Sequence, residues 1–189
     1  MVPENLEKEL LSRTLTERIQ FIAAYFAGEK IVFSTSFGQE DQAITQAIAG
    51  TKSNIEIFTL DTGRQFQESY ELMDLTIKKY NIPLQTYFPN TAAVETLVAE
   101  KGFHSFYTSV ENRKECCFVR KMEPLNRALQ GAKVWITGLR AEQSENRADM
   151  PLIEWDENRQ LFKINPLIDW SFSQLENYLQ EHKIPIRMI

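Results

Sequence analysis

The stretch KIVFSTSFGQED, residues 30–41, predicts a buried strand that runs through a polar loop into a helix. The apolar run 30–34 follows Gly28, and the loop after it consists of small polar residues with one glycine, Gly38. Backbone N–H groups in such a turn, together with the N-terminus of the following helix, can bind an anion. A plain strand-to-helix turn capped by Ser36 is the competing interpretation.

The same alternation of strand and helix continues along the chain. Further strands are predicted at 55–60, 84–88 and 133–137, and helices at 40–49, 66–80, 91–101 and from the cysteine segment to Gly131. Residues 4–27 predict N-terminal helices, residues 151–164 a hairpin with its turn at DENR, and Ser171 the cap of a last helix. We therefore expect an α/β fold with a mostly parallel, twisted sheet, helices on both faces and an N-terminal helical extension.

Composition excludes several classes of protein. The chain has 189 residues, 43% of them apolar, and a net charge of -5 without a long basic run, which argues against binding to nucleic acid. Its apolar runs fall far short of the roughly 20 residues that a membrane span needs. The N-terminus shows no signal-peptide pattern, and two cysteines cannot form a disulfide framework, so we expect reduced thiols and a cytoplasmic location.

Two further loops leave predicted strand ends, and loops at the carboxyl ends of parallel strands meet at one crevice. In LDTGR, residues 60–64, aspartate and threonine can bind a sugar or adenine, although an Asp61–Arg64 pair that only closes the loop fits as well. In TGLRAEQSENR, residues 137–147, Arg140 and Arg147 suit phosphate or sulfate. A solvated loop, with these arginines paired to its own glutamates, remains the alternative.

Both cysteines of the chain, Cys116 and Cys117, are adjacent and have basic residues on either side. Cations stabilise thiolates and anionic metal–thiolate clusters, so a metal site with further ligands elsewhere explains the pattern. Adjacent cysteines are a poor zinc signature, and on a helix they can simply be one core and one surface residue. By themselves they predict half of a site.

Together, five segments resemble the adenylylsulfate reductase branch of the phosphoadenylylsulfate (PAPS) reductase family. They are FSTSFGQED (33–41), LDTGRQFQESYELMD (60–74), KECCFVRKMEPLNRAL (114–129), WITGLRAEQSENR (135–147) and NPLIDWS (165–171). The resemblance implies a fold like that of the adenine nucleotide α-hydrolases. It divides the chain into an N-terminal helical segment, 1–28, and a PAPS-reductase-like nucleotide-binding domain, 29–189.

The resemblance also implies an activity: thioredoxin-dependent reduction of adenosine 5′-phosphosulfate to sulfite and AMP in sulfate assimilation. In this branch a 4Fe–4S cluster is held by a CC pair and a later CxxC, which makes Cys116 and Cys117 its metal ligands here. Lys121 matches a supporting lysine between cluster and sulfate. The implied substrate-binding residues are Ser34, Thr35, Ser36, Phe37, Gly38, Leu60, Asp61, Thr62, Gly63, Arg64, Gly138, Arg140, Gln143, Ser144 and Arg147, with Arg140, Arg147 and Lys121 neutralising the phosphosulfate.

The family pattern continues past HKIPI to a CxxC and a catalytic cysteine, whereas this sequence ends in HKIPIRMI. We therefore expect a truncated member that binds nucleotide, lacks the nucleophile and has an incomplete or absent cluster. A homo-oligomer is compatible with the sequence. The alternatives are a PAPS reductase, a non-catalytic nucleotide-binding module, or an ATP pyrophosphatase or sulfate adenylyltransferase-like enzyme. Enzymes of the last class usually carry an SGGxDS-type loop, and the loop STSFGQED of this chain does not match that pattern.

Overall fold

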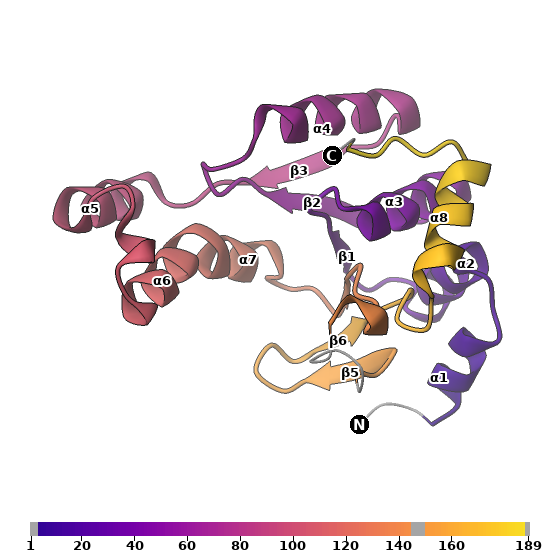
Figure 1. The fold of residues 1–189 in the computed structure, drawn as a ribbon. Helices are drawn as coiled ribbons and strands as arrows, with labels where there is room; N and C mark the ends of the chain where they lie inside the picture. Colours follow the sequence, from indigo (N-terminus) through magenta and orange to yellow (C-terminus); the bar gives the residue numbers. More distant parts are fainter. Residues whose placement is uncertain (1–3, 145–149, 188–189) are drawn as a thin grey trace.

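The computed structural model describes residues 4–144 and 150–187. Its centre is a six-stranded sheet in the order β3-β2-β1-β4-β6-β5 (Figure 1). All neighbouring strands are parallel except β5 and β6, which form an antiparallel hairpin. Along the chain the strands are β1(Ile31–Ser34), β2(Glu56–Leu60), β3(Leu84–Tyr87), β4(Val134–Ile136), β5(Ile153–Asp156) and β6(Leu161–Ile164).

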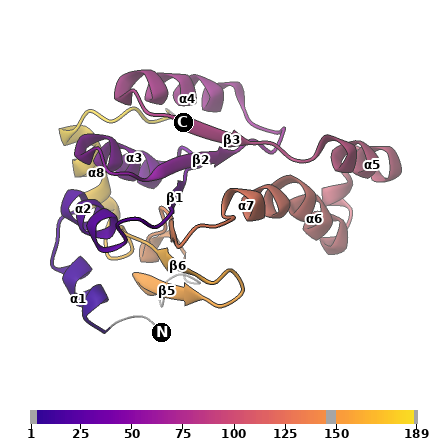
Figure 2. The same ribbon diagram turned by 180° about the vertical axis from the view of Figure 1, so that it is seen from behind.

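Helices cover both faces of this sheet, as predicted. One face packs against the N-terminal helices, α3 and α8 in a large apolar core, and the other packs against α7 in a smaller one. Figure 2 shows the same arrangement from behind. The α-helices are α1(Glu4–Leu11), α2(Leu15–Tyr25), α3(Gln39–Thr51), α4(Gln67–Tyr80), α5(Thr91–Lys101), α6(Val110–Cys117), α7(Glu123–Ala128) and α8(Phe172–Glu181).

The alternation of side chains along each strand determines which residues can reach a ligand. In β1, Ile31 and Phe33 lie in the large core, whereas Val32 lies in the smaller core under α7. Because side chains alternate with a period of two, Ser34 shares the α7 face with Val32. Register places Val32 beside Trp135 of β4, and Trp135 beside Lys163 of β6. The α7 face therefore carries polar and aromatic residues near the strand ends.

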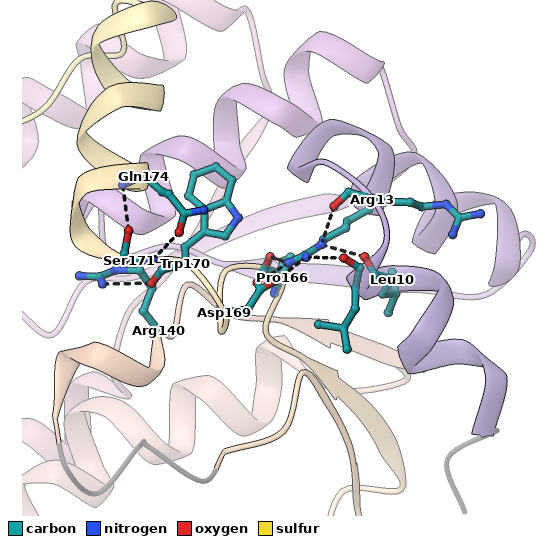
Figure 3. A network of polar contacts seen from close by, with 10 residues as sticks. Leu10, Arg13, Arg140, Pro166, Asp169, Trp170, Ser171 and Gln174 are labelled. Carbon is teal, nitrogen blue, oxygen red and sulfur yellow. Dashed lines mark hydrogen bonds and ion pairs between the residues drawn. The ribbon is translucent and has the colours of Figure 1, made fainter.

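The N-terminal helices are joined to the sheet by one buried arginine. Arg18 of α2 donates hydrogen bonds to the carbonyl groups of Leu10, Arg13 and Pro166 and forms a two-bonded ion pair with Asp169 (Figure 3). Burial raises the pKa of Asp169, but the hydrogen bond and charge of Arg18 outweigh this and hold the pKa below its ordinary value. The boundary at residue 28 stays a prediction, although α1 and α2 contribute to the same core as the sheet.

The cysteine segment departs from the single helix predicted to reach Gly131. Cys117 ends α6, a π-helical turn covers Phe118–Met122, and α7 follows and ends at Ala128. Proline has no N–H to donate, so Pro124 at the start of α7 interrupts the regular ladder of backbone hydrogen bonds. A π-turn accommodates the interruption without ending the helical path. This turn carries Lys121.

The segment from α5 to α6 extends away from the sheet, beyond the carboxyl ends of β2 and β3 (Figures 1 and 2). Exposed aromatic residues on it include Phe103 and Tyr107. Across residues 4–144 and 150–187, no helix combines the length and apolar character required to cross a bilayer.

We predict that Arg18→Met lowers the free energy of unfolding by about 2–4 kcal/mol, because it leaves several carbonyl groups and a carboxylate without their buried donor. Urea unfolding followed by circular dichroism measures this loss. Arg13→Met is the matched control: Arg13 pairs with Glu9 at the surface, where such pairs contribute less than about 1 kcal/mol. Equal losses in the two variants would contradict the role assigned to Arg18.

Candidate functional site

A cleft of about 710 Å³ opens at the carboxyl ends of the central strands, between the sheet and the start of α7. This volume suits a nucleotide-sized ligand. The lining combines the loops after β1, β2 and β4 with the π-turn, α7 and the β5–β6 hairpin. Its residues are Ser34, Thr35, Ser36, Gly38, Glu40, Asp41, Leu60, Thr62, Gln65, Lys121, Met122, Leu125, Trp135, Thr137, Gly138, Leu139, Gln143, Arg159 and Lys163.

The loop after β1 is held by a buried carboxylate. Asp41 accepts hydrogen bonds from the backbone N–H and the hydroxyl of Ser36, at 2.6 and 2.7 Å. Phe37 has a φ of 61° and packs with Leu72 and Met73 under α4, so its ring lies in the core instead of the cleft. Gly38 is the N-cap of α3 and offers no side-chain cap, which leaves the first-turn N–H groups without a side-chain acceptor from this position.

Asp41 also brings the loop after β4 close to the loop after β1. A Cβ atom added to Gly138 would lie 2.1 Å from Oδ1 of Asp41, closer than atoms can approach. Glycine at position 138 is therefore required by this contact. Burial raises the pKa of Asp41 to about 6, although the hydrogen bonds from Ser36 act in the opposite direction.

Arg140, which the sequence predicted to bind phosphate or sulfate, is paired with carboxylates, one of them a glutamate of its own loop as in the alternative interpretation. Its guanidinium is buried, donates to Glu40 at 2.9 Å and lies 3.4 Å from Glu142. It also lies 3.4 Å from the carbonyl of Trp170 (Figure 3). It does not belong to the described lining of the cleft, whereas Glu40 does. The guanidinium therefore neutralises a carboxylate of the cleft.

The loop after β2 is closed by its own polar groups. Asp61 accepts hydrogen bonds from the N–H of Gly63 and the hydroxyl of Tyr70, at 2.8 and 2.7 Å. The guanidinium of Arg64 donates to the carbonyl of Phe103 and lies 4.6 Å from the ring centre of Phe106. In the described contacts Asp61 and Arg64 therefore have separate partners and do not form the Asp61–Arg64 pair considered as the alternative.

Two cations of the cleft come from the β5–β6 hairpin, for which the sequence predicted no binding role. Lys163 and Arg159 both lie 5.8 Å from the ring centre of Trp135, whose indole N–H donates to the hydroxyl of Ser34 at 2.8 Å. The sequence signal was weak, because a lysine in a half-buried strand and an arginine in a turn are ordinary surface features. Register across β4 and β6 places Lys163 beside Trp135, and Arg159 lies in the turn that leads into β6.

The predicted substrate residues thus divide into two groups. Ser34, Thr35, Ser36, Gly38, Leu60, Thr62, Gly138 and Gln143 line the cleft, as does Lys121. In the described part of the chain, the lining omits Phe37, Asp61, Gly63, Arg64, Arg140 and Ser144. Arg147 falls outside the described residues. The substrate-binding roles remain predictions for all of them.

The cysteines lie at the end of α6 on the projecting segment. Cys116 is half-buried and Cys117 is exposed. A 4Fe–4S cluster takes four ligands, and within residues 4–144 and 150–187 no three His, Cys, Asp or Glu residues gather as a metal site. These residues supply two thiolates and do not fit a complete cluster site by themselves.

Comparison with known proteins identifies the family. The model of the phosphoadenosine phosphosulfate reductase domain matches residues 30–189. The chain belongs to this family. Within it, the chain is 43% identical over 182 residues to adenosine 5′-phosphosulfate reductase of Agrobacterium fabrum, covering 96% of this chain and 69% of that protein. It is 45% identical over 181 residues to the enzyme of the same name from Sinorhizobium fredii, covering 96% and 71%.

Solved structures agree with the fold expected for this reductase domain. The PAPS reductase of Candida auris, in a phosphate complex, superposes with a TM-score of 0.82 at 26% identity, over 99% of this chain and 90% of that one. The NH3-dependent NAD synthetase of Campylobacter jejuni has a TM-score of 0.62 at 9% identity over 96% and 75%, which shows a shared fold alone. The predicted adenine nucleotide α-hydrolase-like architecture is thereby confirmed.

We predict that Gly138→Ala destabilises the reductase domain by about 1–3 kcal/mol, because the new methyl group forces Asp41 or the loop after β4 to move. Urea unfolding measures the change. Gly50→Ala makes the same chemical change on the exposed side of α3, where a Cβ meets nothing closer than 3.8 Å. There we expect a gain of about 0.5–1 kcal/mol from helix propensity. A neutral Gly138→Ala would contradict the close packing.

A second prediction concerns pH. The folded domain keeps a proton on Asp41 up to about pH 6, whereas the unfolded chain releases it near the ordinary value of 3.8. The contribution of Asp41 to stability therefore decreases as pH rises through this window. Between pH 4.5 and 6.5, the free energy of unfolding of the wild type should decrease by about 2 kcal/mol more than that of Asp41→Asn. Urea unfolding of both proteins at each pH measures this difference. Identical pH profiles would show that Asp41 ionises normally.

Proposed function

We propose that the chain binds adenosine 5′-phosphosulfate in the cleft, as the nucleotide-binding part of a reductase that produces sulfite and AMP. The observation that carries the proposal is the juxtaposition of the β1 loop, the N-terminus of α3 and Lys121 around one cleft. Similarity to relatives named adenosine 5′-phosphosulfate reductase supports the choice of nucleotide.

The chemistry of the lining suggests how the ligand is oriented. Leu60, Met122 and Leu125 form an apolar part of the cleft that suits adenine. The N-terminus of α3, beginning at Gly38, suits the 5′-phosphoryl group, because uncapped N–H groups and the helix dipole favour an anion. Lys121, on the π-turn across the cleft, then adds a positive charge near the same group.

In this proposal Arg140 neutralises the carboxylate of Glu40 at the N-terminus of α3. Glu40 lies in the first turn of α3, where its charge would oppose a bound anion. The ion pair with the buried Arg140 offsets this charge, and the pair is buried enough to be weakly screened by salt. Arg140 is thus a positioning residue that prepares the anion site without contacting the sulfate.

The chemical step needs groups beyond those in the cleft. Cys116 and Cys117 lie at the end of α6 and do not belong to the described lining. We assign them to a 4Fe–4S cluster whose other ligands are not among residues 4–144 and 150–187. We expect the chain alone to bind nucleotide without releasing sulfite. Thioredoxin as reductant, a cytoplasmic location and a homo-oligomer remain predictions. Sulfite assayed with thioredoxin and a reductant tests the expected lack of turnover.

We predict that AMP and adenosine 5′-phosphosulfate bind the chain and that Lys121→Met weakens both by about tenfold, which corresponds to about 1.4 kcal/mol. The loss follows from removing a charge-assisted contact to an oxyanion. Isothermal titration calorimetry measures it. Lys114→Met removes the same charge from the exposed surface of the neighbouring α6 and should bind as the wild type. Absence of AMP binding by the wild type would refute the proposal.

A further inference from the structure

The β5–β6 hairpin carries two ion pairs. Lys163 pairs with Glu154 at 2.7 Å and Arg159 with Asp156 at 2.8 Å. Lys163 and Arg159 line the cleft, whereas neither carboxylate belongs to its described lining. The positive partner of each pair therefore faces the ligand space, on the β6 side of the cleft.

Trp135 connects these cations to the β1 loop. Ser34, Trp135 and Lys163 follow one another across the adjacent strands β1, β4 and β6, on the face covered by α7. The two cations lie within cation–π distance of the indole ring, an attraction that holds them beside the cleft. The hydroxyl that accepts from the indole N–H is that of Ser34, the last residue of β1, directly before the loop proposed to hold the 5′-phosphoryl group.

Both cations retain donors for a ligand. An ammonium group has three N–H bonds, and the bond to Glu154 uses one of them. The guanidinium of Arg159 has five N–H bonds, and the bond to Asp156 uses one of them. The Lys163 side chain is 16% exposed, so a contact made there is partly shielded from water. A charge in such a position attracts an oxyanion more strongly than a surface lysine does.

We propose that Lys163, supported by Arg159, binds an oxyanion of the nucleotide on the β6 side of the cleft and so selects ligands by their charge. This inference rests on the proposed function and extends it, because it adds a binding wall from a hairpin that carries none of the loop motifs. The oxyanion belongs either to the 5′-phosphosulfate or to a 3′-phosphate on the ribose. Both groups are oxyanions, but they differ in which nucleotides should lose affinity when Lys163 is replaced.

The test compares three probes by calorimetry: adenosine, AMP and adenosine 3′,5′-bisphosphate. Lys163→Met should leave adenosine binding unchanged and weaken a charged probe by about tenfold. Equal losses for AMP and the bisphosphate assign the contact to the 5′ group. A loss confined to the bisphosphate, or larger for it, assigns the contact to the 3′-phosphate. Lys78→Met, which removes an exposed charge from α4, is the control and should change none of the three affinities.

A purely structural role for the ion pair is tested by Glu154→Gln. If the pair only stabilises the hairpin, losing either partner weakens all probes alike. If Lys163 binds the ligand, Glu154→Gln frees an ammonium donor and AMP binding stays equal or becomes tighter. A uniform loss for adenosine and AMP in Lys163→Met, or no loss for any probe, overturns the inference while wild-type AMP binding upholds the proposed function. Failure of the wild type to bind AMP defeats both.

Discussion

The contact between Asp41 and the two loops beside it is the constraint on which the cleft depends. A carboxylate that is buried at the start of α3 must have its oxygens satisfied, and Ser36 supplies two donors to it. Its other oxygen lies where a side chain on residue 138 would have to be, so the loop after β4 approaches only because that residue is glycine. The raised pKa of Asp41 is the energetic consequence of this burial.

The segment NPLIDWS supports the same cleft from behind. Asn165 accepts from Thr137 of the β4 loop and donates to the carbonyl of Pro151. Asp169 accepts hydrogen bonds from Arg18 of the N-terminal helices, and the carbonyl of Trp170 lies close to the guanidinium of Arg140. A short stretch of chain therefore ties the helical extension, the hairpin and the cleft together. The polar groups of this segment do not belong to the described lining of the cleft and position Thr137, Arg18 and Arg140 by hydrogen bonds.

Charge in the cleft is distributed differently from what loop motifs alone suggest. The arginine that the sequence placed on the sulfate, Arg140, is paired with Glu40, and Arg64 is engaged with the projecting segment. Lys121 is joined in the lining by Lys163 and Arg159, which are also paired, but with carboxylates that do not belong to the described lining. The positive side of the cleft thus depends on a hairpin whose side chains reach the ligand space through strand register.

Sequence alone determined the α/β architecture, the hairpin at DENR and the family, because each follows from local patterns. Strand and helix periods, turn residues and short motifs are all encoded by neighbouring residues. The tertiary structure alone decided which loop residues reach the cleft. Whether Arg140 meets a ligand or Glu40, and whether Lys163 faces solvent or Trp135, depends on residues about a hundred and about thirty positions away in the chain. Such partners are set by sheet order and register, which no local pattern contains.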